Sequence, residues 1–193
     1  MNRKNTAILA GSLLAILFGV SLFYLVKPAT YRGMVIDPPF DAASITGLTD
    51  SNGAPFQLEG QRGKFVLVFF GYTNCPDQCP TTLAKLKVAV QALGDQSENV
   101  QVVLITTDPI RDSVERLNEY VSHFHVSFLG LTGTLSDLQA VWNSYGVVVE
   151  DGGETHSELV YVIDPAGKLR LTFSSEMTSE DIINDLNSLL AEQ

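Results

Sequence analysis

The chain has 193 residues, of which 45% are hydrophobic and 18% charged, and its formal net charge is −10 at pH 7. This length suits one globular domain with short additional segments. The acidic balance argues against nucleic acid as a partner, because phosphate binding requires a basic surface.

An apolar segment near the start predicts a membrane anchor. Residues 7–26 carry no charged side chain and are rich in Leu, Ile, Phe and Val. Twenty such residues in a helix span about 30 Å, the thickness of a bilayer core. A cleaved signal peptide would have a shorter apolar region of about 7–15 residues and an Ala-x-Ala site. No such site lies near residues 27–30, so we expect an uncleaved transmembrane helix at 7–26.

The charges around this segment predict its orientation. Arg3 and Lys4 precede it, so the positive-inside rule places residues 1–6 in the cytoplasm. The start is not the Arg- and Ser-rich leader of mitochondrial import, which favours the bacterial inner membrane, with the domain facing the periplasm. The chain after Lys27 carries 22 acidic residues against nine basic ones, a net charge of −13. Such a surface can steer cationic partners or simply favour solubility.

The next two segments predict a linker and a hairpin. Residues 27–42 contain three prolines, a glycine and no clear period, which indicates a linker ahead of a domain at 43–193. Residues 44–58 alternate weakly between apolar and polar around a turn at 50–53, which predicts a β-hairpin.

The uncharged run at 65–70 predicts a central strand buried on both faces. A helical pattern follows, so the only two cysteines, Cys75 and Cys79, lie in a strand-to-helix loop, where open α/β sheets place their sites. Pro80 fits the first position of that helix. Cys79 would then lie near the positive end of the helix dipole, which favours a thiolate. The apolar face of the helix consists of Leu83, Leu86, Val90 and Leu93.

The spacing of the two cysteines bears on their chemistry. Two thiols so close can form a disulfide or bind one soft metal ion. A bridge across a three-residue gap removes little chain entropy and would stabilise the fold poorly. The spacing therefore favours redox or metal chemistry over a structural disulfide.

Residues 100–107 predict a second buried strand, followed by a helix that Asp112 or Ser113 can cap. Asp108 precedes a proline and fits a turn-forming role better than that of an acid in a site. His123 and His125 lie at the end of the helix, where they can interact with terminal carbonyls. The apolar face of this helix consists of Val114, Leu117, Tyr120 and Val121.

The remaining elements complete a mixed α/β pattern. We predict strands at 128–133 and 147–149, a helix at 134–145 with Trp142 in the core, an antiparallel pair at 159–163 and 168–173, and a final helix at 179–190. This order predicts a thioredoxin-like fold, with a mixed central sheet flanked by helices and an N-terminal β-hairpin extension, preceded by one transmembrane helix.

His156 differs from the other histidines because it lies in a Gly-rich, polar loop directly before a buried strand. In a thioredoxin-like sheet, that loop lies beside the cysteine loop. Two thiolates and an imidazole suit Cu(I), and also Cu(II) or Zn(II). Three protein ligands would leave the site open to an incoming donor, which suits delivery better than storage.

Several motifs resemble those of the SCO/SenC family, membrane-anchored copper proteins that assist cytochrome c oxidase assembly. They are the Cys-Pro-Asp-Gln-Cys-Pro segment within 70–83, residues 108–112 and 128–133, and His156-Ser157 ahead of 160–167. The resemblance implies a thioredoxin fold and one copper ion, Cu(I) or Cu(II), held by Cys75, Cys79 and His156. It also implies delivery to the dinuclear copper site of cytochrome c oxidase subunit II.

Three readings of the function stay open. The first is a metallochaperone, which is not an enzyme and receives copper from an upstream donor. The second is a thiol–disulfide oxidoreductase, with Cys75 and Cys79 as its redox pair, that keeps the oxidase copper-site cysteines reduced. The third is an interaction module with an inert disulfide. We expect a monomer, with Asp77 or water as a candidate fourth ligand.

Overall fold

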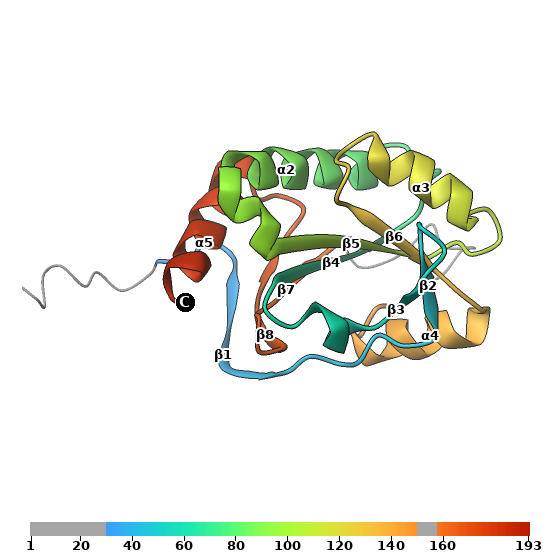
Figure 1. Cartoon of the computed structure of the whole chain (residues 1–193), viewed down its shortest axis with the longest axis horizontal. Helices are drawn as coiled ribbons and strands as arrows, with labels where there is room; N and C mark the ends of the chain where they lie inside the picture. The colour runs from blue at the N-terminus through green and yellow to red at the C-terminus, as the bar shows by residue number, and fades with distance from the viewer. Residues whose placement is uncertain (1–29, 150–157) are drawn as a thin grey trace, which may run out of the picture. The chain divides into compact units, whose positions relative to one another are not determined.

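The computed structural model describes residues 30–149 and 158–193, within which the strands form one eight-stranded sheet. In chain order the strands are β1 (Met34–Asp41), β2 (Leu48–Asp50), β3 (Pro55–Phe56), β4 (Phe65–Gly71), β5 (Val100–Thr106), β6 (Leu129–Thr132), β7 (Val160–Ile163) and β8 (Lys168–Phe173). Their order in the sheet is β1-β8-β7-β4-β5-β6-β2-β3 (Figure 1).

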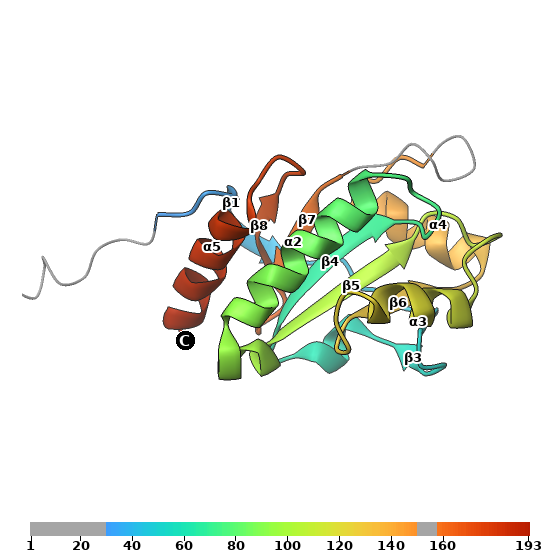
Figure 2. The same ribbon diagram turned by 90° about the horizontal axis from the view of Figure 1, so that it is seen from above.

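Helices cover both faces of this sheet. They are α2 (Gln78–Ala92), α3 (Val114–Ser122), α4 (Leu135–Ser144) and α5 (Ser179–Ala191), with 3₁₀ segments η1 (Leu58–Gln61) and η2 (Gly94–Asn99). Helices α2, α3 and α5 lie over one face, and α4 lies over the other (Figures 1 and 2). The predicted helices at 134–145 and 179–190 correspond to α4 and α5.

Strand β4 divides the core into two clusters. All seven of its residues are buried, as the uncharged run predicts for a central strand. Since successive side chains point to opposite faces, residues 65, 67 and 69 join the cluster under α2 and α5. Residues 66, 68 and 70 join the cluster under α4, which also contains Trp142, as predicted. Burial of these apolar faces positions the segment that follows β4.

The pairing of β4 confirms the mixed sheet. It runs parallel to β5, with Phe70 opposite Ile105, and antiparallel to β7, with Phe69 opposite Val160. The predicted pair at 159–163 and 168–173 is the antiparallel pair of β7 and β8. One end of the sheet therefore contains the end of β4, the end of β5 and the start of β7.

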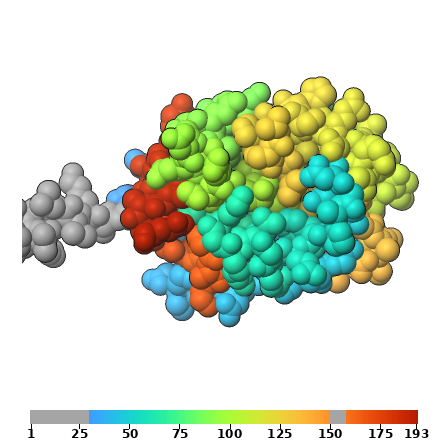
Figure 3. Space-filling model, viewed as in Figure 1, coloured from blue at the N-terminus to red at the C-terminus, as the bar shows by residue number. Residues whose placement is uncertain are grey.

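The predicted hairpin is confirmed as β2 and β3, which pair antiparallel around the turn at 51–54. It extends the main sheet, because Thr49 of β2 pairs with Thr132 of β6. Asn118 Nδ2 on α3 donates to the Ser51 carbonyl oxygen over 2.6 Å. In the space-filling view, this hairpin (cyan) accordingly lies against α3 (Figure 3).

The predicted linker at 27–42 is wrong in its second half, because residues 34–41 form β1. Strand β1 is the outer strand of the sheet and pairs with β8 on one side only. Its pairing is irregular between Val35 and Phe40, the interval that holds Pro38 and Pro39. Prolines are tolerated there because an edge strand does not need every N–H for its ladder.

The predicted strand at 147–149 is also wrong, since the structure has no strand at these described residues. Gly146, with φ of 68°, turns the chain at the end of α4, and the Val147 N–H then donates to the Trp142 carbonyl oxygen over 2.8 Å. The Val147 side chain is buried against the core. Its apolar character therefore reflects packing around the end of a helix.

The predicted anchor at 7–26 and the cytoplasmic segment at 1–6 lie outside the described residues. Among residues 30–149 and 158–193, no helix has the length and apolar composition needed to cross a membrane.

Candidate metal centre

Cys75 and Cys79 lie where β4 ends and α2 begins. Helix α2 starts at Gln78 with Asp77 as its N-cap residue, two residues earlier than the sequence predicts. Pro80 is thus the third helical residue, not the first. Proline is tolerated at this position because the N–H groups of the first turn have no acceptor within the helix.

The two sulfur atoms have different surroundings. Both cysteines are thiols, Cys79 being fully buried and Cys75 half-buried. The Cys79 N–H donates to Cys75 Sγ over 3.3 Å, so the sulfur of Cys75 receives an N–H from the first turn of α2. This contact holds the Cys75 sulfur against the first turn of α2.

The expectation of a thiolate at Cys79 is wrong for the metal-free protein. Burial raises the pKa of the Cys79 thiol well above its usual range. A backbone hydrogen bond at Tyr72 acts in the opposite direction, and the neighbouring Cys75 raises the pKa further. Desolvation therefore outweighs the hydrogen bond at Tyr72, the one contribution that favours the thiolate.

Gly71 provides the space that the Cys79 sulfur occupies. A Cβ atom at residue 71 would lie 2.8 Å from Cys79 Sγ and 3.1 Å from Phe69 Cε1. Both distances are shorter than ordinary van der Waals contacts. The close approach of this sulfur to the end of β4 therefore requires glycine.

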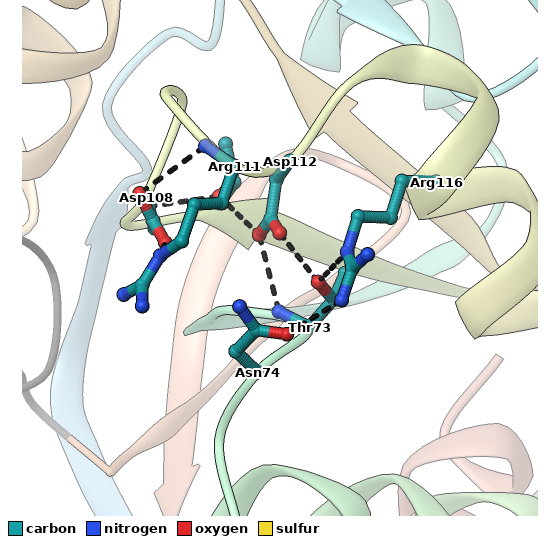
Figure 4. Close-up of polar contacts among 7 residues, drawn as sticks. Thr73, Asn74, Asp108, Arg111, Asp112 and Arg116 are labelled. Atoms are coloured by element: carbon teal, nitrogen blue, oxygen red, sulfur yellow. Dashed lines mark hydrogen bonds and ion pairs between the residues drawn. The ribbon is translucent and has the colours of Figure 1, made fainter.

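A buried carboxylate fixes the residues just before the cysteines (Figure 4). Asp112 is 1% exposed, and its Oδ2 accepts from the Thr73 N–H over 3.1 Å and from Thr106 Oγ1 over 2.7 Å. Its Oδ1 accepts from Thr73 Oγ1 over 2.6 Å. Asp112 thereby ties the cysteine loop to the end of β5. Ser113 caps α3 in its place, by accepting from the Arg116 N–H.

Arg116 holds the same loop from the other side, as Figure 4 shows. Its Nε donates to Thr73 Oγ1 over 2.7 Å, and its Nη2 donates to Asn74 Oδ1 over 2.5 Å. This network could not be predicted from the sequence, because Thr73 and Asn74 lie about 40 positions from Asp112 and Arg116. Asp108 forms a turn as predicted, by accepting from the Arg111 N–H and pairing with its guanidinium.

The two described histidines lie at the end of α3. His123 Nδ1 lies 2.7 Å from the Glu119 carbonyl oxygen, which confirms the predicted interaction with the helix end. His125 Nδ1 instead lies 2.8 Å from Ser127 Oγ, so that prediction is wrong for His125. The described turn at 124–128 folds back on itself and brings this hydroxyl to the ring.

The structure brings together two of the three predicted ligands. His156 lies outside the described residues, as does the loop around it. In the described ranges, no three His, Cys, Asp or Glu side chains lie close enough to hold a metal. Asp77, the candidate fourth ligand, has its carboxylate at 3.3 Å from Thr81 Oγ1. The described part of the site is therefore a pair of thiols in a loop that hydrogen bonds hold in place.

Comparison with known proteins identifies the family. The model of the SCO1/SenC family matches residues 37–191, which is most of the chain. The chain belongs to the SCO1/SenC family.

Relatives within the SCO1/SenC family include SCO2 of Saccharomyces cerevisiae, a mitochondrial protein, which is 36% identical over 148 residues. That match covers 72% of this chain and 47% of the yeast protein, so the chain spans about half the length of that relative. An SCO2-like protein of Rickettsia felis is 30% identical over 202 residues, covering 96% of this chain and 98% of the relative.

A solved structure of Bradyrhizobium japonicum ScoI with copper bound has the same fold. It is 32% identical, with a TM-score of 0.71, and the match covers 78% of this chain and 99% of ScoI. The thioredoxin-like α/β fold with a mixed sheet is therefore confirmed.

Proposed function

We propose that this chain binds one copper ion through Cys75, Cys79 and His156 and delivers it to the dinuclear copper site of cytochrome c oxidase subunit II. The observation that carries the proposal is the pair of thiols held at the end of β4 in a SCO1/SenC chain. Thiolates are soft ligands that select Cu(I), and imidazole also suits Cu(II). The copper bound to ScoI of B. japonicum supports this cargo.

The sheet topology supports His156 as the third ligand. Strand β7 starts opposite the end of β4, and four positions separate His156 from Val160. An extended chain of four residues reaches about 14 Å. Neighbouring strands lie only about 4.8 Å apart, so this reach is sufficient for an imidazole to meet the thiols.

The proposed location rests on the sequence. A helix at 7–26 would anchor the chain in the bacterial inner membrane, with residues 1–6 in the cytoplasm and the copper domain in the periplasm. Copper binding needs reduced thiols, so the site must be served by an upstream copper donor and a thiol reductant.

Copper binding to the reduced full-length protein tests the ligand set. We expect one Cu(I) per chain in a chelator competition, and two sulfur neighbours and one nitrogen neighbour by X-ray absorption. His156→Ala should remove the nitrogen neighbour and weaken binding at least tenfold. His123→Ala, a control at the C-cap of α3, should change neither. Unchanged binding of Cu(I) and Cu(II) by His156→Ala would refute this ligand set.

The asymmetry of the two thiols favours a second candidate, thiol–disulfide exchange with the oxidase copper-site cysteines. Cys75 is half-buried and receives an N–H from the start of α2, whereas Cys79 is fully buried. An accessible sulfur at a helix N-terminus suits nucleophilic attack. Cys79→Ser should then trap a mixed disulfide through Cys75, and His156→Ala should exchange at the wild-type rate. The absence of any trapped species would eliminate this activity.

A further inference from the structure

A cavity of about 460 Å³ lies where α3 meets the loop that carries the cysteines. Its volume is within the range of about 300–1,000 Å³ that is typical of small-molecule sites. The walls come from α3, the turn after it and the cysteine loop, and they are formed by Arg116, Glu119, Tyr120, His123, Phe124 and Thr73. The cavity therefore adjoins the candidate metal centre without including Cys75 or Cys79.

Arg116 supplies fixed hydrogen-bond donors to this cavity. Its Nε donates to Thr73 Oγ1 over 2.7 Å and its Nη2 to Asn74 Oδ1 over 2.5 Å, so the guanidinium group is held against the cysteine loop (Figure 4). The remaining N–H groups of Arg116 have no acceptor among the residues that the structure describes. A guanidinium group held in this way can bind a carboxylate through two parallel hydrogen bonds. Asn74 directly precedes Cys75, so such a carboxylate would lie at the loop that carries the cysteines.

Glu119 and His123 supply acceptors to the same cavity. The contacts of Glu119 within residues 30–149 and 158–193 use its carbonyl oxygen, so its carboxylate is free to bind a ligand. His123 Nδ1 lies 2.7 Å from that carbonyl oxygen, which can only accept, so Nδ1 carries the proton. In the neutral ring, Nε2 is then an acceptor. A negative charge and a second acceptor therefore lie on the same cavity as the guanidinium group.

This arrangement matches the charges of a zwitterionic amino acid. Residues three positions apart on a helix have Cβ atoms about 5–6 Å from each other, so one amino-acid group can bridge Arg116 and Glu119. Its carboxylate would bind the guanidinium group, and its ammonium would donate to the Glu119 carboxylate and to His123 Nε2. The rings of Tyr120 and Phe124, with 5.4 Å between their centroids, provide an apolar wall for the rest of the molecule.

We propose that this cavity binds a small thiol that carries a zwitterionic amino-acid group, such as cysteine or a γ-glutamyl tripeptide. The bound thiol is the reductant of the Cys75 and Cys79 pair. This inference rests on the proposed function, because copper loading requires a thiol reductant and the cavity names its chemical class.

The reduction proceeds by two thiol–disulfide exchanges. The sulfur of the bound thiol attacks Cys75, the less buried end of the disulfide, and forms a bond with it. The bond between Cys75 and Cys79 breaks, and the Cys79 sulfur keeps the electron pair and takes up the proton that the small thiol loses. A second thiol molecule then attacks the sulfur of the first. The small thiol leaves as its own disulfide, and Cys75 becomes a thiol again.

Binding is tested with S-methyl-L-cysteine and S-methylglutathione, which cannot exchange with a disulfide. We expect the reduced, copper-free, full-length protein to bind one molecule of at least one of them in isothermal titration calorimetry. Glu119→Gln should weaken this binding about tenfold, because it removes the charge that pairs with the ammonium. Glu98→Gln, an equal charge change at an exposed position in η2, should bind like wild type. On the ligand side, 3-(methylthio)propionate lacks the ammonium of S-methyl-L-cysteine and should bind about tenfold more weakly.

The rate of reduction of the oxidised protein tests the role of the bound thiol. With cysteine or glutathione, the rate should saturate as the thiol concentration rises, and the lower half-saturating concentration identifies the preferred one. Glu119→Gln should raise this concentration about tenfold and leave the limiting rate unchanged, because Glu119 binds the thiol and takes no part in the exchange. With 2-mercaptoethanol, which has no amino-acid group, the rate should rise linearly and be equal in wild type and Glu119→Gln.

The outcomes separate this inference from the proposed function. A wild-type protein that binds neither S-methyl compound, or a Glu119→Gln variant that binds like wild type, would overturn the cavity as a site and leave the copper proposal standing. Binding combined with a linear rate for both natural thiols would overturn the role of the bound thiol as reductant. A wild-type protein that binds no copper would overturn the proposed function, and the calorimetry, performed without copper, would still report on the cavity.

Discussion

At the scale of single residues, the site depends on how closely side chains pack around the Cys79 sulfur. Gly71 leaves the space that this sulfur fills, and burial there raises the pKa of the Cys79 thiol. The Cys75 sulfur is half-buried and receives the Cys79 N–H. One sulfur is thus held in the core, and the other belongs to a partly exposed residue.

Gly71→Ala should disturb the buried sulfur. The new methyl group would lie 2.8 Å from Cys79 Sγ, so the sulfur or the end of β4 must move. Overpacking of this kind costs about 1–3 kcal/mol. We expect a lower urea midpoint and weaker Cu(I) binding.

Gly60→Ala is the control for this substitution, because a Cβ at Gly60 meets no atom within 4 Å. It should leave both the urea midpoint and Cu(I) binding unchanged. Wild-type stability and binding in Gly71→Ala would show that the sulfur does not need this space.

At the scale of elements, Asp112 joins three parts of the molecule. It lies just before α3, and its carboxylate accepts from Thr73 in the cysteine loop and from Thr106 at the end of β5. Arg116 on α3 holds Thr73 and Asn74 from the opposite side. The loop before the cysteines is therefore fixed by a helix and a strand.

Asp112→Asn should loosen this junction. Both carboxylate oxygens of Asp112 accept hydrogen bonds, and Asn replaces one of them with an NH₂ group that cannot accept. Hydrogen bonds to charged groups contribute about 1.5–3 kcal/mol, and we expect a loss of that size in the free energy of unfolding. Amide hydrogen exchange at Thr73 should become faster. Asp95→Asn, at an exposed position in η2, should alter neither measurement. Unchanged exchange at Thr73 would contradict the proposed junction.

At the scale of the whole molecule, the start of the domain is tied to its last helix. The fully buried carboxylate of Asp185 on α5 accepts from the N–H groups of Arg32 and Gly33. Glu192, which follows α5, accepts from Tyr31 and from Arg170 Nη2. These contacts hold the chain at the point where β1 begins.

Stability should depend on pH through Glu192. Burial raises the pKa of its carboxyl group, but hydrogen bonds from Tyr31 and Arg170 outweigh this and hold the pKa below its usual value. Ionised Glu192 therefore stabilises the fold at pH values above the pKa of the unfolded chain, about 4.5. This stabilisation is lost as the pH falls through the lower pKa of the folded protein. Glu192→Gln should be less stable than wild type at pH 7, and the difference should shrink in urea unfolding below about pH 4. A difference independent of pH would refute this account.

Prediction from sequence succeeded where local pattern determines structure. The uncharged run of β4 and the helical periodicity after it are strong local signals, and they located the cysteines at a strand end. Strand β1 was missed because Pro38 and Pro39 indicate a linker unless the pairing with β8 is known. Asp112 and Ser113 were equal candidates for the cap of α3, and local pattern could not separate them because the partner of Asp112, Thr73, lies 39 positions away. Periodicity placed Tyr120 on a buried face but could not reveal that its hydroxyl lacks an acceptor among the described residues.

The start of β1 lies at the same end of the sheet as the loop that carries the cysteines. Met34 pairs with Thr172, Phe173 with Val160, and Val160 with Phe69 beside the end of β4. Three strand spacings, about 14 Å, therefore separate β1 from β4, the strand that leads into the cysteine loop. We expect that a partner protein bound over the cysteine loop would also lie close to the start of β1.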